Sequence, residues 1–388
     1  MSGIVVYGHG GSENHGNEAI VRGIHSIFPD YDILLYSLSE QVDRKFELDK
    51  ICTIKPMTKK PAPFGVERIY RHILNKYFPT NKKRLGYLFS PLLENADREK
   101  IYVLEAGDQY CEPGLHAFYY AYINSELRKK GIKTVLLGCT INKSKITHEV
   151  VRDLNNYSLI ITRESLTYRN IVNSGVNTKV LLAPDPAFSM IPKRCDLSEY
   201  PAFNNTEVIG INAGFLAQGN EKFEGDLIQN LRIAIEWILN NTDFSIALLP
   251  HVNWSYRNTD YNTLRDLLID SKRMFIVEER RADEMKYIVS KCKLLVALRT
   301  HISISGISSC TPTILTGYKT KTLGICQDVF GDNYEKYFVD ITQTREKDLV
   351  KNKIINFLEN PEFDTSTIKK YILNIEIIKN AIEGLLHE

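Results

Sequence analysis

The chain has 388 residues, a formal net charge of +2 at pH 7, 43% hydrophobic residues and 25% charged residues. This length exceeds what one hydrophobic core supports and suits two domains of an ordinary globular protein. The small net charge does not indicate a nucleic-acid-binding protein, and no apolar run approaches the ~20 residues of a membrane span. Seven cysteines without a CxxC pair predict neither a disulfide framework nor a zinc site. The N-terminus enters an apolar strand without a basic leader, so we expect no signal peptide and a cytoplasmic protein.

The first half of the chain alternates short apolar strands with helices. A strand at 4–7 precedes a glycine-rich polar loop at 8–17 and a helix at 18–28, which is the opening of a Rossmann-like unit. The glycine spacing is not GxGxxG, so we expect the loop to approach a ligand other than a dinucleotide. Further strands are expected at 33–36, 101–104, 134–137, 159–161 and 180–182, with helices at 115–130, 147–157 and 166–173.

Residues 51–97 interrupt this alternation. The segment holds five prolines and is locally basic. Its one predicted helix, at 66–78, has apolar side chains on one face and basic ones on the other, and Lys82, Lys83 and Arg84 follow it. Two interpretations remain open: the helix docks on its own domain, or it lies on a membrane surface.

A second α/β half follows an aperiodic segment at 189–206, which we interpret as a linker. Its strands are expected from 208 and at 244–249, 274–277, 294–298 and 311–315, its helices at 227–239 and 284–292, and two amphipathic segments at 348–358 and 367–385 close the chain. Alternating strands and helices in two halves predict an α/β fold of two Rossmann-like, doubly wound domains that face each other across a cleft.

The stretch at 293–324 carries the densest set of candidate site residues. Arg299 and His301 follow a strand and precede a helix of small residues, and Lys319 and Lys321 follow the next strand. Parallel strand ends meet at one edge of a sheet, so these residues predict an anion site that contains a proton donor. Either residue alone would more often be structural, but their combination favours a functional site.

Other candidates also stand at strand ends. Arg163 could add to the anion site, and His251 is a second candidate for the acid. Glu105 and Asp108 follow the strand at 101–104, where a carboxylate suits a general base.

Five segments resemble the polysaccharide pyruvyl transferase family. They are YGHGGSENHGNEAI from residue 7, TRESLTYRNIVNSGV from 162, LLAPDPAF from 181, LLPHVNWSYRNTDY from 248 and ALRTHISISGISSCTPTILTGYKTKTLGI from 297. The chain departs from the family pattern at Thr300, where an apolar residue is more usual, and in the insert at 51–97, across which acceptor identity cannot be carried over.

The resemblance implies a GT-B-like pair of domains, with an N-terminal acceptor domain over 1–190, a C-terminal donor domain over 205–365 and a last helix, 366–388, that crosses back. It also implies transfer of the pyruvyl group of phosphoenolpyruvate to two sugar hydroxyls as a cyclic ketal. Phosphoenolpyruvate is the co-substrate, and no metal or other cofactor is expected. We expect a lipid-linked saccharide as acceptor, a peripheral contact with the inner face of the membrane, and no nucleic-acid partner.

Each candidate then takes a role in this reaction. His301 is the expected acid, Arg299 holds the phosphate, and Asp108 is the expected base. The residues expected to contact the donor are Arg163, His251, Arg299, Lys319 and Lys321. The residues expected to contact the acceptor are Asn14, His15, Asn17, Glu18, Glu105 and Asp108. For Asn14 and Asp108 an alternative stays open, that they only fix their loops.

Two other functions are compatible with this architecture. One is a nucleotide-sugar-dependent GT-B glycosyltransferase, although no carboxylate for a donor ribose stands out beside Arg299. The other is a non-catalytic carbohydrate-binding relative, against which the intact pair of Arg299 and His301 argues.

Overall fold

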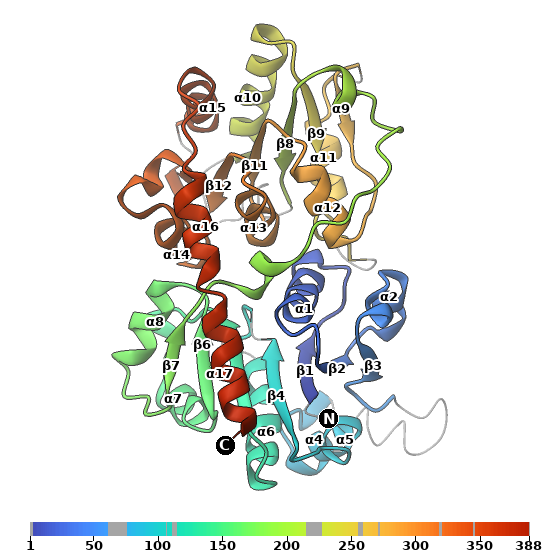
Figure 1. Ribbon diagram of the computed structural model, residues 1–388, viewed down its shortest axis with the longest axis vertical. Helices are drawn as coiled ribbons and strands as arrows, with labels where there is room; N and C mark the ends of the chain where they lie inside the picture. The colour runs from blue at the N-terminus through green and yellow to red at the C-terminus, as the bar shows by residue number, and fades with distance from the viewer. Residues whose placement is uncertain are drawn as a thin grey trace. The chain divides into compact units, whose positions relative to one another are not determined.

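The computed structural model describes residues 3–60, 76–105, 107–110, 115–214, 227–254, 259–270, 272–317, 320–343 and 346–387. These residues form two units, each built around a parallel β-sheet that carries helices (Figure 1). The first unit comprises residues 1–12, 25–185 and 374–388, and the second comprises 13–24 and 186–373. The predicted α/β fold with two doubly wound parallel sheets is confirmed.

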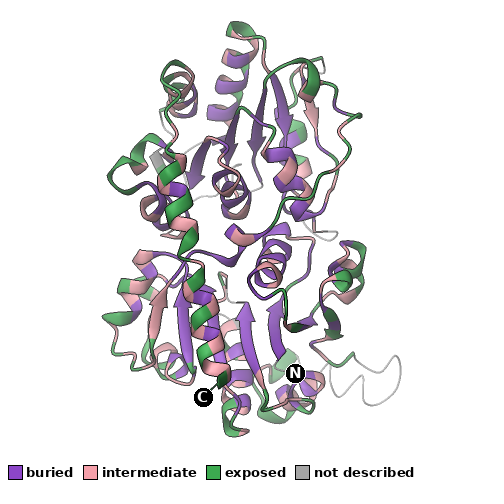
Figure 2. Cartoon of the chain, viewed as in Figure 1, coloured by how far each residue is buried: buried purple, intermediate pink, exposed green. Residues whose placement is uncertain are grey.

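The sheet of the first unit has seven strands among the described residues, in the order β3-β2-β1-β4-β5-β6-β7. Its strands are β1 (Gly3–His9), β2 (Asp32–Ser37), β3 (Thr53–Pro56), β4 (Lys100–Glu105), β5 (Thr134–Cys139), β6 (Leu159–Thr162) and β7 (Val180–Leu182). The central strands β1, β5 and β6 are buried throughout, which explains their continuous apolar sequences (Figure 2). The order changes direction between β1 and β4, so their carboxyl ends form the point where open α/β sheets bind ligands.

Helices and short 3₁₀ turns connect these strands. The helices are α1 (His15–Ile27), α2 (Glu40–Lys45), α4 (Lys82–Leu88), α5 (Ser90–Leu93), α6 (Leu115–Lys129), α7 (His148–Leu154) and α8 (Ser165–Val172), and the turns are η1 (Leu48–Lys50) and η2 (Lys143–Lys145). Side chains of α5, α6 and α7, among them Leu92, Ile123 and Leu154, form one core with the sheet. The C-terminal helix α17 (Glu376–His387) belongs to this unit, where Tyr31 donates to Glu383 (3.2 Å).

The sheet of the second unit has six strands among the described residues, in the order β10-β9-β8-β11-β12-β13. They are β8 (Val208–Asn212), β9 (Ser245–Leu248), β10 (Met274–Ile276), β11 (Leu294–Ala297), β12 (Thr313–Gly317) and β13 (Phe338–Asp340). Here the order changes direction between β8 and β11, and the carboxyl ends of these strands form the second switch point.

Helices cover both faces of this second sheet. They are α9 (Ala202–Asn205), α10 (Leu227–Asn241), α11 (Asp260–Leu267), α12 (Ala282–Val289), α13 (Thr300–Ser308), α14 (Thr320–Phe330), α15 (Leu349–Glu359) and α16 (Thr365–Leu373), with 3₁₀ turns η3 (Pro186–Ser189), η5 (Gly331–Lys336) and η6 (Ile341–Gln343). Leu231, Leu264 and Val350 bring α10, α11 and α15 into one core, and Met285 and Ile302 bring α12 and α13 into another.

Two predicted elements differ in the structure. The strand expected at 311–315 lies at 313–317, and a helix that the sequence analysis did not predict, α14, begins at Thr320. The single segment expected at 367–385 is two helices, α16 and α17, separated by a turn in which Asn374 accepts the backbone N–H of Ile377 (3.1 Å). Neither glycine nor proline occurs at this break, so the sequence carries no strong signal for it.

Most of the helix predicted at 66–78 lies outside the described residues. Lys82, Lys83 and Arg84 form the first turn of α4, and the side chain of Asn81 caps that helix by accepting two backbone N–H groups. No helix in the described part of the chain is long and apolar enough to cross a membrane.

Candidate functional site

The carboxyl end of β11 delivers the pair that the sequence singled out. Arg299 directly precedes α13 with an extended backbone, and His301 lies in the first turn of that helix. The backbone N–H of Arg299 donates to Oδ1 of Asn212 at the end of β8 (2.9 Å). The two strand ends that form the switch point of this sheet are therefore tied together.

The guanidinium of Arg299 forms an ion pair with Asp260. Nη2 of Arg299 lies 2.6 Å from Oδ1 of Asp260; the aspartate side chain is fully buried and 17% of the arginine side chain is exposed. The other oxygen of Asp260 accepts the backbone N–H groups of His251 and Val252 (3.1 and 3.0 Å). A Cβ at Gly214 would lie 2.4 Å from Oδ1 of Asp260, so glycine leaves room for the pair. Asp260 thus fixes both the guanidinium and the turn after β9.

His301 packs against the backbone at the start of α1. A Cβ at Gly16 would lie 2.3 Å from Nδ1 of His301, a distance that real Cβ contacts do not reach, so this approach requires glycine. Asn14 fixes the same turn, because its Oδ1 accepts the N–H of Gly16 (3.0 Å) and its carbonyl accepts the N–H of Asn17 (2.9 Å). Asn14 therefore has the loop-fixing role that the sequence left open for it, and it donates to Oδ1 of Asn17 (3.4 Å).

His251 lies in the turn after β9 and is 2% exposed. Burial lowers the pKa of its imidazole well below the usual value, and His15, His301 and Arg299, when positively charged, lower that pKa further. The rings of His15 and His251 meet edge to face with centroids 5.6 Å apart. His251 is therefore neutral near pH 7, which disfavours the acid role that the sequence considered for it.

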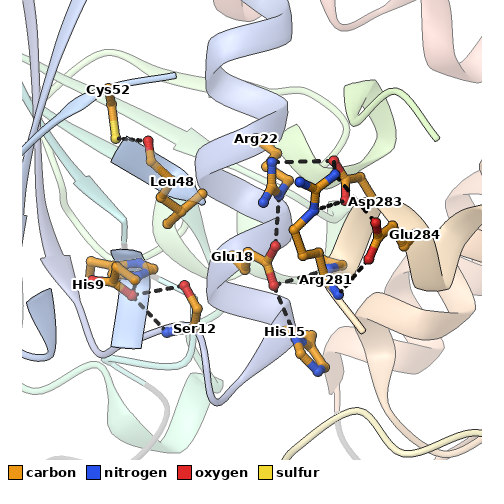
Figure 3. A network of polar contacts seen from close by, with 12 residues as sticks. His9, Ser12, His15, Glu18, Arg22, Leu48, Cys52, Arg281, Asp283 and Glu284 are labelled. Atoms are coloured by element: carbon orange, nitrogen blue, oxygen red, sulfur yellow. Dashed lines mark hydrogen bonds and ion pairs between the residues drawn. The ribbon is translucent and has the colours of Figure 1, made fainter. Parts of the chain in front are cut away.

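Glu18 is fully buried and connects α1 to α12 (Figure 3). Oε2 of Glu18 lies 3.0 Å from Nδ1 of His15 and accepts the backbone N–H of Ala282, the first residue of α12 (3.0 Å). Oε1 accepts from Nε of Arg22 (2.7 Å), and Arg22 also pairs with Asp283 (3.3 Å). Glu18 thus caps α12 and orients His15. We revise its predicted role from acceptor contact to positioning residue, since its carboxylate is enclosed by these partners.

Arg163 is fully buried in the first unit. Its guanidinium donates to Thr140 Oγ1 (2.9 Å), to Asp185 (3.0 Å) and to Asp108 (2.8 Å). These contacts join the ends of neighbouring strands, and they enclose the group that was expected to contact the donor. We therefore revise Arg163 to a positioning residue. Asp108 keeps 39% of its side chain exposed and is held in place by the arginine.

A buried histidine that the sequence did not single out stands at the end of β1. Nδ1 of His9 lies 2.8 Å from Glu105 and Nε2 lies 3.0 Å from Asp43. Asp43 also accepts the N–H and hydroxyl of Ser12 (2.9 and 2.8 Å) and the hydroxyl of Ser37. Glu105 is 3% exposed, so the structure gives it an internal partner where the sequence expected a sugar contact.

The surroundings of His9 favour its charged form. Burial by itself would lower the pKa of His9, but the charge of Glu105 and the hydrogen bonds to Asp43 and Glu105 outweigh it and raise the pKa to about 10. The same contacts hold the pKa of Asp43 below its usual value, although burial opposes this. A positively charged imidazole, paired with two carboxylates, therefore lies at the switch point of the first sheet.

The two predicted lysines, Lys319 and Lys321, follow β12 in the chain. Lys321 lies half-buried in the first turn of α14, beyond the end of β12, and Lys319 lies outside the described residues. Among the residues that the structure describes, no group of three or more His, Cys, Asp or Glu side chains is placed to hold a metal ion.

Sequence reasoning missed Asp260, His9 and Asp43. Asp260 is 39 residues from Arg299, and Asp43 is 34 residues from His9. Such separations leave no local pattern to read. The available signal was weaker: Asp260 is the penultimate residue of the segment LLPHVNWSYRNTDY, and His9 is the last residue of the buried strand β1.

Known proteins resemble this chain in two respects, the sequence family and the fold. The family model for polysaccharide pyruvyl transferase matches residues 14–320. None of the curated proteins compared with the chain matches it. The fold is similar to a UDP-GlcNAc 2-epimerase from Neisseria meningitidis bound to UDP-GlcNAc (TM-score 0.60, 14% identity, 100% of each chain covered). It is also similar to a putative UDP-N-acetylglucosamine 2-epimerase from Listeria monocytogenes (TM-score 0.59, 12% identity, 95% of this chain and 91% of that chain). A third similar structure is the α,α-trehalose 6-phosphate synthase from Burkholderia multivorans (TM-score 0.59, 9% identity, 100% of this chain and 98% of that chain). At these identities the likeness shows the fold alone, and that fold is GT-B-like.

Proposed function

Because the chain belongs to the polysaccharide pyruvyl transferase family, we propose that it transfers the pyruvyl group of phosphoenolpyruvate to two hydroxyls of a sugar, forming a cyclic ketal. The observation that carries the proposal is the pair of Arg299 and His301 at the end of β11, with Asp260 bracing the guanidinium. An anion-binding group and a proton donor two residues apart suit a small anionic donor that must be protonated on carbon.

Arg299 binds the phosphate group of phosphoenolpyruvate. A guanidinium presents paired N–H donors that match phosphate oxygens, which an ammonium group imitates poorly. The start of α13 adds backbone N–H donors and a favourable helix dipole. Lys321 and Lys319, which follow the next strand, supply further positive charge for the departing phosphate.

His301 protonates the methylene carbon of phosphoenolpyruvate. Imidazole exchanges protons near neutral pH, which suits an acid that must donate and then recover its proton. Protonation makes C2 cationic in character, and the first sugar hydroxyl adds to C2. The bond between C2 and the phosphate oxygen then breaks, and the second hydroxyl closes the ketal. Each hydroxyl loses one proton, so the reaction also needs a base.

Asp108 is the proposed base for the sugar hydroxyls. Its exposed carboxylate is held by Arg163, which fixes its orientation. Asn17, half-buried in the first turn of α1, is the acceptor contact that we retain from the glycine-rich loop. Asp108→Asn should lower turnover with little change in phosphoenolpyruvate affinity, and the reverse pattern would assign Asp108 to the donor.

The acceptor that we propose is a lipid-linked saccharide at the inner face of a membrane. The support is the basic composition of the insert at 51–97 and the basic first turn of α4. Each Lys or Arg near an anionic surface contributes about 1 kcal/mol to binding. Vesicles with anionic lipid should retain the protein at low salt and release it at high salt, and a failure to sediment with them at low salt would refute the contact.

The direct test of the proposed function is phosphate release from phosphoenolpyruvate with a galactoside as acceptor. The wild-type protein should release phosphate and form a ketal of the sugar. His301→Ala should lower kcat by about 10²–10⁴-fold and leave phosphoenolpyruvate binding largely intact, whereas Arg299→Lys should weaken binding as well. Turnover of a UDP-sugar without phosphoenolpyruvate would instead support the glycosyltransferase alternative. Full activity of His301→Ala would assign the acid elsewhere.

A further inference from the structure

A short two-stranded contact in the second unit places four polar side chains on one side. Asn14 and Val252 form an isolated antiparallel bridge. The N–H of His15 donates to the carbonyl of His251 (3.1 Å), and the N–H of Asn253 donates to the carbonyl of Glu13 (2.8 Å). Side chains alternate between the two sides of paired extended chains. Glu13, His15, His251 and Asn253 therefore share the side opposite Asn14 and Val252, which agrees with the ring contact between His15 and His251. Of these four, Glu13 is only partly buried.

Two of these side chains have unused hydrogen-bonding groups. Neither ring nitrogen of His251 and neither polar atom of the Asn253 amide has a hydrogen-bond partner within the described part of the chain. Both residues are buried, with 2% of His251 and 9% of Asn253 exposed. Buried polar atoms are nearly always paired, so four such atoms on one side of the bridge indicate a bound group that satisfies them.

The types of atom restrict what that group can be. A neutral imidazole offers one donor and one acceptor, and a primary amide offers two donors and an acceptor. The neutral form of His251 follows from its lowered pKa. A phosphate or carboxylate anion has acceptors only, so it would leave the imidazole acceptor and the Asn253 carbonyl unsatisfied. Hydroxyl groups both donate and accept, and they can satisfy all four atoms.

We propose that His251 and Asn253 form a subsite for hydroxyl groups of the saccharide acceptor. This inference rests on the proposed function and adds to it a place where the sugar is recognised. It revises the sequence-based assignment of His251 to the donor. The subsite lies beside the donor residues, because Asp260 accepts the N–H of His251 and pairs with Arg299.

Asn253→Leu tests the subsite with little change in side-chain volume. A matched control is Thr263→Val in α11, because the Thr263 hydroxyl is also buried and without a partner among the described residues, but lies outside the bridge. His251→Phe provides a second variant. For each full-length protein we would measure binding of phosphoenolpyruvate by calorimetry and binding of methyl galactoside, glucoside and mannoside by saturation-transfer NMR.

The wild-type protein and Thr263→Val should bind at least one of the three glycosides. Asn253→Leu and His251→Phe should bind that glycoside about tenfold or more weakly, which corresponds to roughly 1.4 kcal/mol, with phosphoenolpyruvate affinity unchanged. Normal glycoside binding by both variants would overturn the subsite and leave an ordered water as the partner of these atoms. Wild-type protein that binds phosphoenolpyruvate but none of the glycosides would also overturn it. A wild-type protein that does not bind phosphoenolpyruvate would instead overturn the proposed function.

Discussion

His9→Gln removes the charge that lies between two buried carboxylates of the first unit. Asp43 is fully buried and Glu105 is 3% exposed, and His9 supplies a counter-charge to each. Leaving a buried charge without its partner typically costs about 3–5 kcal/mol. The raised pKa of His9 expresses the same interaction: a change from 6.5 in the unfolded chain to about 10 in the folded one corresponds to roughly 5 kcal/mol. We therefore expect a loss of several kcal/mol.

The pH dependence has a definite sign. Because the folded state raises the pKa of His9, the folded unit holds a proton that the unfolded chain releases above about pH 6.5. The stabilisation is therefore complete below that pH and declines as the pH rises toward about 10. In His9→Gln this decline should be absent.

Amide hydrogen exchange of peptides from β1 and β4 measures this stability locally. The local probe is needed because two units need not unfold together, and both tryptophans, Trp237 and Trp254, lie in the second unit. Their fluorescence serves as an internal reference. His148→Gln, at an exposed histidine of α7, is the matched control and should change stability by less than about 0.5 kcal/mol. A loss below about 1 kcal/mol in His9→Gln, or flat wild-type stability from pH 7 to 10, would refute the reasoning.

Three further predictions concern the second unit. Gly16→Ala should lower kcat about tenfold or more with little effect on phosphoenolpyruvate affinity, because the new Cβ displaces His301; unchanged kcat would mean that this contact does not position the acid. Asp260→Asn should raise the KM for phosphoenolpyruvate about tenfold or more, since Arg299 loses its carboxylate partner, and an unchanged KM in steady-state kinetics would contradict the bracing role. The second unit should gain stability above pH 7, because burial lowers the pKa of Lys286 to about 7 while the unfolded chain keeps its proton up to about pH 10.4. Lys286→Met should remove this gain in tryptophan-monitored denaturation, and its persistence would point to another group.

The sequence predicted the sheets well because buried parallel strands have short, continuous apolar sequences. β5 was expected at 134–137 and extends over 134–139, and β11 was expected at 294–298 and covers 294–297. Arg299 and His301 were found for the same reason, since a strand end followed by a helix start is a local pattern. The pairing of side chains across the fold has no such pattern, because sequence spacing does not encode which strand ends become neighbours.

Charged residues at strand ends illustrate that limit. Glu18 and Arg163 have the side-chain chemistry of ligand contacts, and only their burial and partners show that they hold other residues in place. Asn253 is the opposite case: the sequence analysis did not select it, and its buried amide is without a hydrogen-bond partner among the described residues. A sequence gives the functional groups at a site, and tertiary contacts decide which of them face inward to the protein.

The three partners of Glu18 also restrict how this protein can diverge. One carboxylate holds His15, Arg22 and the first N–H of α12, so a substitution there would disturb the orientation of His15 and a helix cap together. Stabilising changes elsewhere could restore folding but not the orientation of His15. Natural variation at position 18 should therefore be rare. Where it occurs, it should be accompanied by substitutions at positions 22 and 283, so that the three positions change together.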